Sequence, residues 1–240
     1  MQNFELFSFA SADELARAAA GAWLDEIELA NRAGKTHSVA LSGGRITQKF
    51  FAATVAQAKA RAVSLARVHF FWADERCVPP TDPDSNFKTA NELLLLPLNI
   101  AAEKIHRLRG EDSPSAAMKI AEQELCRIAP QNKNHQPVLD LIFLGMGEDG
   151  HIASLFPNAA VNILDISAPY WVVENSPKPP PTRISLSYRM IFAAKNVWIL
   201  VSGAGKESAL RKSLSPRGRT PMARVLQARP VKIFSDLAEF

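Results

Sequence analysis

A histidine and an aspartate two positions apart mark the segment of this chain that is best suited to chemistry. Asp149 and His151 follow the apolar run 141–144, in a loop with glycines at three of the six positions from 145 to 150. Histidine has the side-chain pKa nearest neutrality, so it commonly moves protons in catalytic pockets. Glycines after a buried strand let a substrate approach the backbone closely. The pattern predicts an active-site loop and favours a catalytic over a structural His151.

The segment Ser42-Gly43-Gly44-Arg45 has the composition of a phosphate-binding turn. It follows a short apolar run at 39–41 and precedes a helical pattern. Backbone N–H groups freed by the glycines, together with the N-terminus of a helix, form a natural phosphate site. A tight strand-to-helix turn without any ligand is an equally good interpretation of this segment taken alone.

Three consecutive charged residues, Asp74, Glu75 and Arg76, follow the apolar run 68–72. Open α/β sheets keep their clefts at the carboxyl ends of their strands, which is where this run falls. The planar guanidinium of Arg76 could hold a phosphate or a carboxylate, and Asp74 could position a hydroxyl or a water. The alternative is a local ion pair between one of the acids and Arg76, which contributes little when exposed. The position favours the functional interpretation.

Two further segments bring cations to predicted strand ends. Lys178 and Arg183 flank a proline-rich approach to one strand, and the turn Gly203–Lys206 follows another. Neither segment is specific by itself. Because several strand ends together offer glycine, arginine and lysine, the sequence predicts a pocket for a phosphorylated small molecule.

Apolar strands that alternate with amphipathic helices must position these residues. Ser11-Ala12-Asp13-Glu14 fits a capping box, and Gly34 suits the end of the helix that follows. The alternation predicts an α/β fold, a three-layer αβα sandwich of Rossmann-like, doubly wound type with a largely parallel sheet. The proline-rich stretch 177–181 is too short for a linker, so residues 1–240 are predicted to form a single domain. The predicted strands are 39–41, 68–72, 138–144, 170–174, 183–187, 197–202 and 231–234, and the predicted helices are about 12–33, 45–58, 86–95, 113–128, 204–214 and 221–227.

The composition excludes several classes of protein. With 47% hydrophobic and 22% charged residues the chain can bury a sizeable core. No apolar run approaches the roughly 20 residues that span a bilayer, and the N-terminus lacks the order of a secretion signal. Cys77 and Cys126 have no CxxC spacing and no Cys/His cluster around them, so neither disulfides nor a metal site is predicted. We therefore expect a cytoplasmic protein with no membrane partner.

The segment 206–232 carries eight basic residues against one acidic residue. Nucleic-acid binding, attraction of a small anionic substrate and a solvated surface are three interpretations of such a segment. No aromatic residue lies within it to stack on bases. We favour the solvated surface and expect no nucleic-acid partner.

Two other motifs suggest chemistries that their surroundings disfavour. Residues 145–150 also fit the dinucleotide fingerprint G-x-G-x-x-G, and Asp165 supplies an acid about 20 positions on. Pro157 comes too soon for the crossover helix that such a fingerprint opens, so we do not expect NAD or another cofactor. Ser154 lacks the G-x-S-x-G elbow of serine hydrolases. The remaining histidines are taken as structural: His37, His69, His106 and His135.

At these motifs the chain resembles the 6-phosphogluconolactonases, within the superfamily that also holds glucosamine-6-phosphate deaminase. The resemblance runs from about residue 40 to residue 206, and its most specific part is the loop Gly145–Pro157. The other matching pieces are Ser42-Gly43-Gly44, Trp72–Pro79, Asp84–Phe87, Pro181–Leu186 and Gly203–Lys206.

The resemblance implies a cytoplasmic hydrolase of the oxidative pentose phosphate pathway, which opens 6-phospho-D-glucono-1,5-lactone without metal or cofactor. It implies that His151 is the general base that activates water, that Asp74 is a partner in the pocket and that Asp149 orients the imidazole. Its partner would be a small phosphorylated sugar lactone, and the protein would be a monomer or a weak homo-oligomer. The implied phosphate or oxyanion contacts are Ser42, Gly43, Gly44, Arg76, Arg183 and Lys206. Arg45, which departs from the family pattern, either adds a phosphate contact or points to solvent.

Comparison with the two sister activities favours the lactonase. The deaminase loop continues with Phe-Asn-Glu-Pro, whereas Phe156 stands here where that glutamate would be, and a phenyl ring cannot polarise an imidazole. Arg45 also replaces a small hydroxyl residue that the family usually carries after its glycines, and Phe87 replaces a frequent tyrosine. A sugar-phosphate sensor without turnover is the alternative from another class, but a sensor would need neither Asp74 nor His151.

Overall fold

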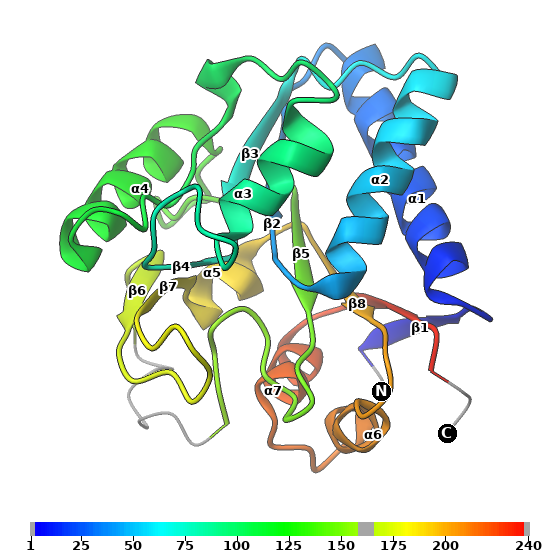
Figure 1. The fold of residues 1–240 in the computed structure, drawn as a ribbon, viewed down its shortest axis with the longest axis vertical. Coiled ribbons are helices and arrows are strands. Elements are labelled where there is room, and N and C mark those ends of the chain that lie inside the picture. The colour runs from blue at the N-terminus through cyan, green and yellow to red at the C-terminus, as the bar shows by residue number, and fades with distance from the viewer. Residues whose placement is uncertain (1–2, 158–165, 238–240) are drawn as a thin grey trace.

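A parallel sheet of six strands forms the centre of the computed structural model, which describes residues 3–157 and 166–237. The strand order is β1-β9-β8-β5-β2-β3, and every neighbouring pair is parallel (Figure 1). The inner strands are apolar along most of their length because helices cover both faces of such a sheet. The prediction of an α/β fold with a largely parallel sheet is therefore confirmed. The strands are β1 (Phe4–Ser8), β2 (His37–Leu41), β3 (Val68–Trp72), β5 (Leu141–Gly145), β8 (Asn196–Val201) and β9 (Val231–Ser235).

Strand β1 was not predicted from the sequence. Its residues are mostly exposed, and Leu6 and Phe7 remain more than a third accessible. It lies at the edge of the sheet and pairs only with β9, more than 220 positions along the chain. A short half-exposed edge strand has no apolar run that would reveal it.

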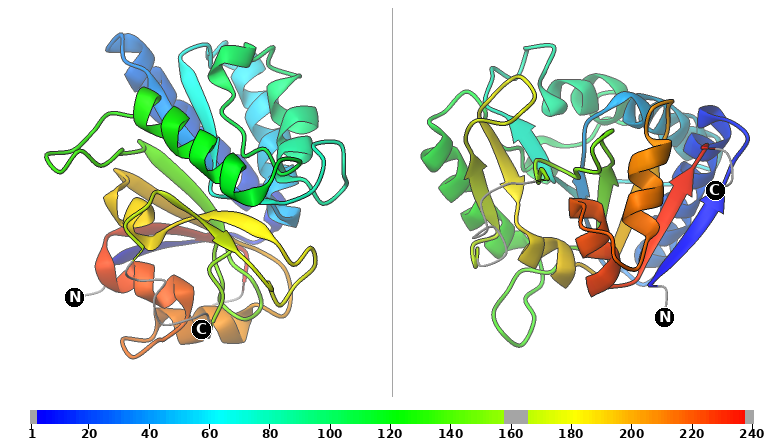
Figure 2. Two further views of the ribbon diagram at one scale, coloured as in Figure 1. Left: turned by 90° about the vertical axis from the view of Figure 1, so that its left-hand side faces the viewer. Right: turned by 90° about the horizontal axis from the view of Figure 1, so that it is seen from below.

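The helices cover the sheet on two sides. Helix α1 begins at the N-cap Ser11, whose hydroxyl accepts the Glu14 N–H at 3.2 Å. Trp23 of α1 packs on Phe70 of β3 and Phe143 of β5, while α6 and α7 lie on the opposite side of the sheet (Figure 2). No helix among the described residues is long and apolar enough to cross a bilayer. The helices are α1 (Ala12–Arg32), α2 (Arg45–Ala60), α3 (Asn86–Ala90), α4 (Pro114–Ile128), α5 (Tyr188–Ala193), α6 (Glu207–Leu214) and α7 (Pro221–Ala228), with a π-helical turn (Asn91–Leu95) and a 3-10 turn (Ala102–Lys104).

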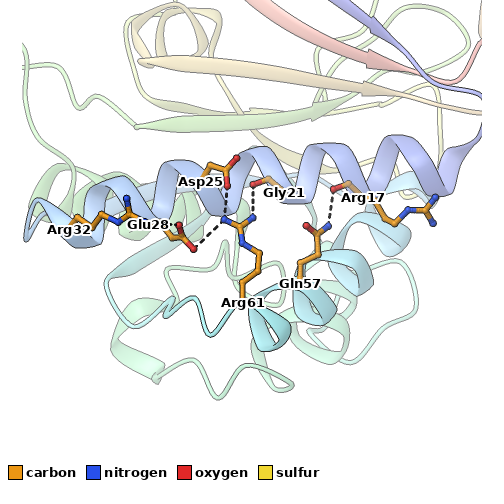
Figure 3. A network of polar contacts seen from close by, with 7 residues as sticks. All are labelled: Arg17, Gly21, Asp25, Glu28, Arg32, Gln57 and Arg61. Carbon is orange, nitrogen blue, oxygen red and sulfur yellow. Dashed lines mark hydrogen bonds and ion pairs between the residues drawn. The ribbon is translucent and has the colours of Figure 1, made fainter.

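Polar contacts join α1 to α2 along their exposed edge (Figure 3). The Arg61 guanidinium donates to the Gly21 carbonyl at 3.3 Å and to the Asp25 carboxylate at 2.5 Å. Gln57 donates to the carbonyl of Arg17 at 2.8 Å. Exposed ion pairs stabilise little individually, but these contacts fix the direction of α2, whose N-terminus lies at the site described below.

The strands predicted at 170–174 and 183–187 exist, but they lie outside the parallel sheet. They are β6 (Tyr170–Val173) and β7 (Arg183–Leu186), and with β4 (Asp74–Arg76) they form a separate antiparallel sheet in the order β4-β7-β6. No crossover helix separates β6 from β7, so the two strands pair antiparallel, as a direct connection requires. The sequence predicted a largely parallel sheet, but it did not predict that these two strands pair in a separate antiparallel sheet.

The order of the strands creates a switch point between β2 and β5. From β2 the chain continues outward to β3, whereas from β5 it continues through β8 to β9 on the other side. The connections therefore diverge at this point, and their loops leave a crevice beyond the strand ends. Ligands in open α/β sheets bind in such a crevice.

Candidate active site

A pocket lies at the carboxyl ends of the neighbouring strands β8, β5, β2 and β3. Each of these strands leads into one of the segments singled out from the sequence. The pocket is lined by all the predicted site residues except Asp149, which contacts the pocket residue His151 from outside. The residues that it brings together are Ser42, Gly43, Gly44, Arg45, Asp74, Arg76, His151, Arg183 and Lys206.

The imidazole of His151 is held by Asp149. Its Nδ1 lies 2.5 Å from a carboxylate oxygen of Asp149, and that oxygen also accepts the backbone N–H of His151 at 3.2 Å. An Nδ1–H that donates to the carboxylate leaves Nε2 unprotonated, which is the form that a base needs. Burial lowers the pKa of His151 below its ordinary value, although the Asp149 hydrogen bond and charge act to raise it. Burial would raise the pKa of Asp149, but the contacts with His151 outweigh it and lower that pKa.

The glycines of this loop make room for side chains of the protein itself. A Cβ at Gly147 would lie 2.0 Å from ring atoms of His151. A Cβ at Gly150, where φ is +81°, would lie 2.7 Å from side-chain atoms of Thr220, and the Gly150 carbonyl accepts the Met222 N–H at 3.2 Å. The sequence suggested room for a substrate. In the structure, Gly147 and Gly150 also allow the histidine to fold back and the loop to seat against α7.

Asp74 is buried, with 5% of its surface exposed, and it is fully engaged. One carboxylate oxygen accepts the Ser154 hydroxyl at 2.7 Å, and the other lies 3.3 Å from the side-chain amide nitrogen of Asn86. Ser154 is entirely buried, so it is a support for Asp74, in agreement with the absence of a serine-hydrolase motif. Sequence reasoning had missed this supporting role.

Asn86 contacts both Asp74, after β3, and Gly43, after β2, and sequence reasoning gave it no role. Its amide also donates to the Asp74 carbonyl at 2.8 Å. On its other side Asn86 packs so closely on Gly43 that a Cβ there would lie 1.9 Å from the Asn86 side-chain oxygen. The only signal in the sequence was the segment Asp84–Phe87 in the family resemblance, because nothing in the spacing shows that residue 86 reaches back to residue 43.

Glu75 is a second buried acid, and it organises the turn that carries Asn86. Its carboxylate accepts the backbone N–H groups of Arg76, Asn86 and Phe87 at 2.7–2.8 Å, and the hydroxyl of Ser85 at 3.2 Å. Burial raises its pKa to about 7, against the lowering effect of these backbone donors. Among the described residues, no ion pair joins Asp74 or Glu75 to the Arg76 guanidinium, so that alternative is not supported.

Four cations line the pocket without a carboxylate partner in the described part of the chain: Arg45, Arg76, Lys206 and Arg183. The Arg76 guanidinium donates to the Asp84 carbonyl at 2.6 Å, but its Nε is buried without a hydrogen bond. Burial and the nearby charge of Arg45 both lower the pKa of Lys206. Arg183, the fourth, is 3% exposed and donates to backbone carbonyls of residues 178–180. Cations left unpaired around one pocket favour an anionic ligand.

The other predicted alternatives receive no support from the geometry. Beyond Gly150 the described residues up to 157 form turns, so the G-x-G-x-x-G match opens no helix; Asp165 lies outside the described residues. His37 accepts the Trp23 indole N–H, and His69 pairs with His106, all away from the pocket. Within residues 3–157 and 166–237, no three histidines, cysteines or acids are grouped to hold a metal.

Comparisons with known proteins identify the family. The model of the glucosamine-6-phosphate isomerase/6-phosphogluconolactonase family matches residues 10–234. The chain belongs to this family. A 6-phosphogluconolactonase of Treponema pallidum is 37% identical over 185 residues, which cover 77% of this chain and 75% of that protein. One of Haemophilus influenzae is 37% identical over 174 residues, or 72% of each chain. The solved structure of 6-phosphogluconolactonase from Trypanosoma brucei matches with a TM-score of 0.85 and 26% identity, covering 98% and 97% of the two chains.

The structure places Arg45 and Phe87, the two residues at which a departure from the family pattern was expected from the sequence. The exposed Arg45 begins α2 and lines the pocket, with its guanidinium close to Gly203. Phe87 packs edge-on against Trp72 at 5.6 Å, below the Arg107 guanidinium. Arg45 is thus one of the cations that line the pocket, and Phe87 packs against the core beside it.

Proposed function

We propose that this protein hydrolyses 6-phospho-D-glucono-1,5-lactone to 6-phosphogluconate, the lactonase step of the oxidative pentose phosphate pathway. The observation that carries the proposal is the His151–Asp149 pair at the wall of a pocket that unpaired cations also line. A base and an anion-binding surface are what hydrolysis of a phosphorylated ester requires. Relatives that are 37% identical bear the name of this activity.

In the proposed reaction, Nε2 of His151 takes a proton from a water molecule as the water oxygen bonds to the lactone carbonyl carbon. The tetrahedral intermediate collapses, the bond from this carbon to the ring oxygen breaks, and the ring oxygen receives the proton from His151. The new carboxylic acid then loses its own proton to solvent. Asp149 holds the imidazole and stabilises its protonated form, while Asp74 orders the pocket wall through Ser154 and Asn86. Such a base contributes about 10²–10⁴ in rate.

The phosphate is proposed to bind at the N-terminus of α2. Gly44 is the N-cap of this 16-residue helix and has a φ of +114°, and no side chain caps the first N–H groups. The hydroxyl of Ser42 donates to the Phe143 carbonyl at 2.8 Å, which fixes the turn with its glycines facing the pocket. Helix N-termini with free N–H groups favour anions. The charges of Arg45, Arg76 and Lys206 complete the proposed phosphate site, and Arg183 is the cross-strand neighbour of Arg76.

The wider setting is also part of the proposal. We infer a cytoplasmic enzyme that folds as one domain over residues 1–240 and acts as a monomer or weak homo-oligomer, without nucleic-acid partners. These inferences rest on the composition and on the basic segment 206–232, which lacks aromatic residues.

The test is turnover of freshly made 6-phosphogluconolactone, corrected for spontaneous hydrolysis, with unphosphorylated gluconolactone in parallel. We expect strong preference for the phosphorylated lactone. Lys206→Met should raise KM for that substrate about tenfold and leave the unphosphorylated one unaffected, because a pocket charge is lost. Lys212→Met is the matched control, since Lys212 is exposed on α6 outside the pocket. Binding of 6-phosphogluconate without acceleration of either lactone would establish the sensor instead.

A further inference from the structure

The aromatic ring of Phe156 lies against the imidazole of His151. The two ring centroids are 4.7 Å apart and the ring planes are inclined by 37°. Phe156 is 7% exposed, so its ring separates the imidazole from solvent on that side. The mechanism proposed above does not use this contact.

The backbone brings Phe156 to this place through a tight turn. Ile152 pairs with Met146 on one side and with Leu155 on the other, and the Leu155 N–H donates to the Ile152 carbonyl at 2.9 Å. Ala153, within the turn, adopts a φ of +46°. Ser154 is anchored by its backbone N–H to the Ser185 hydroxyl at 3.2 Å and by its own hydroxyl to the carboxylate of Asp74. The residue that follows this turn therefore has little freedom.

Arg183 also contacts the Phe156 ring. Its guanidinium carbon lies 5.6 Å from the centroid of the Phe156 ring, in cation–π contact. Nε and Nη2 of the same guanidinium donate to the carbonyls of residues 178, 179 and 180, so the cation is itself fixed. The Phe156 ring therefore contacts both the Arg183 guanidinium and the His151 imidazole.

The hydrogen bond to Asp149 alone does not fix the imidazole. It anchors Nδ1, but a ring held at one atom can still tilt about that point, which moves Nε2 relative to a bound substrate. The charged groups that act on His151 are Asp149 on its own loop, Asp74 on β4 and Lys178 in the loop before β7. None of them controls the plane of the ring. The Phe156 ring gives the imidazole a further contact, which limits this tilt.

We propose that Phe156 is a positioning residue for His151: its ring sets the plane of the imidazole and keeps water from one face. This inference rests on the proposed function, in which Nε2 of His151 is the base. Burial is the main cause that lowers the pKa of His151, and the Phe156 ring contributes to that burial. A lowered pKa keeps the imidazole neutral to lower pH, whereas water at this ring would favour the protonated form.

The test compares Phe156→Leu, which keeps an apolar side chain but loses the flat ring, with Phe156→Tyr, which keeps the ring. The matched control is Phe192→Leu, since Phe192 stacks on Tyr188 at 5.6 Å outside the active-site pocket. Two readouts are used: the split between kcat and KM, and the pH titration of the His151 ring protons by NMR. The His151 resonance is assigned by its absence in His151→Gln.

We expect Phe156→Leu to lower kcat about fivefold to twentyfold with KM within twofold, because a base that is misaligned loses rate without losing substrate binding. The titration midpoint of His151 should rise, and Phe156→Tyr and Phe192→Leu should stay near wild type in both readouts. If Phe156→Leu does not fold, Phe156→Met carries the same test with a similar volume and no ring.

Unchanged kcat and an unchanged His151 titration in the folded Leu or Met variant would overturn the inference. The NMR titration separates this inference from the proposed function, because it needs no turnover. A wild-type protein that fails to hydrolyse the lactone, but whose His151 titration shifts in Phe156→Leu, would refute the function and support the positioning role.

Discussion

Strands β5 and β3, which lie on either side of β2, both lead into acidic segments at the pocket edge of the sheet, and the acids of the two segments have different partners. The loop after β5 carries Asp149, whose side chain is 38% exposed and bonds to the His151 ring. The segment after β3 carries Asp74 and Glu75, which are 5% and 2% exposed and bond to amides and hydroxyls. Both segments place carboxylates at strand ends, so residue type alone does not distinguish them.

The difference lies in the partner of each carboxylate. Asp149 has a partner that can gain and lose a proton, so its charge acts on an ionisable group in the pocket. Glu75 accepts hydrogen bonds from three backbone N–H groups, so its carboxylate stabilises the conformation of the turn 85–87. The contacts of an acid at this edge of the sheet therefore indicate its role: an acid bonded to an ionisable side chain can affect proton transfer, and an acid bonded to backbone N–H groups stabilises the fold. Three substitutions can break or sharpen this distinction.

The largest effect on turnover is expected at the proton acceptor itself. His151→Gln should lower kcat by about 10³, because the loss of a general base costs 10²–10⁴ in rate. Binding of 6-phosphogluconate, measured by calorimetry, should change less than threefold, since the cations of the pocket remain. His135→Gln is the control, because His135 is exposed and lies outside the pocket. Equal turnover in the two variants would remove His151 from the proposed mechanism.

Asp149→Asn should have the next largest effect, with a fall in kcat of about 10–10² because the imidazole loses the partner that selects its tautomer. The carboxylate raises the pKa of His151, while burial keeps that pKa below its ordinary value. The wild-type acid limb of kcat/KM should therefore lie below pH 6.5, and in the variant it should move to still lower pH. An acid limb that stays in place, measured over pH 4–8, would show that Asp149 does not act on the base.

Glu75→Gln should affect stability more than turnover. The amide presents N–H groups to backbone donors, so we expect unfolding in urea to become easier by about 1–3 kcal/mol, with kcat within threefold. The folded pKa of Glu75 is about 7 against an ordinary 4.5, so its protonation stabilises the fold below pH 4.5 and this contribution is lost as pH rises to 7. The variant should lack that slope. A large loss of kcat in a stably folded variant would show that Glu75 takes part in catalysis, and would contradict the proposed difference between Glu75 and Asp149.

The sequence predicted the residues of the pocket better than it predicted what holds them. Arg76, Lys206 and the His151–Asp149 pair were predicted because each follows a short apolar run that ends in glycine or charged residues, a pattern visible in a few consecutive positions. Lys178, also named from the sequence, does not line the pocket. Asn86 and Ser154 were not assigned a supporting role, because each supports Asp74 across 12 and 80 positions of the chain. Periodicity carries no information about such distant contacts.

The fold shows the same division between local and distant information. The inner parallel strands were predicted from their apolar runs, whereas β1 and the antiparallel pairing of β4, β6 and β7 were not. A few consecutive residues show that a segment forms a strand, but which other strand it pairs with depends on residues elsewhere in the chain. The contact between Phe156 and His151 belongs to this second class, although the two residues are only five positions apart, because the turn at 152–155 is fixed by Asp74 and Ser185.

The switch point between β2 and β5 has a consequence for the order of events during folding. The pocket draws on residues near positions 42, 74, 150 and 205, and these meet only when β2 has paired with both β3 and β5, and β5 with β8. Parallel pairings across such separations form slowly compared with helices. During refolding, helical signal should therefore return well before lactone turnover, and recovered activity reports that β3, β2, β5 and β8 have paired.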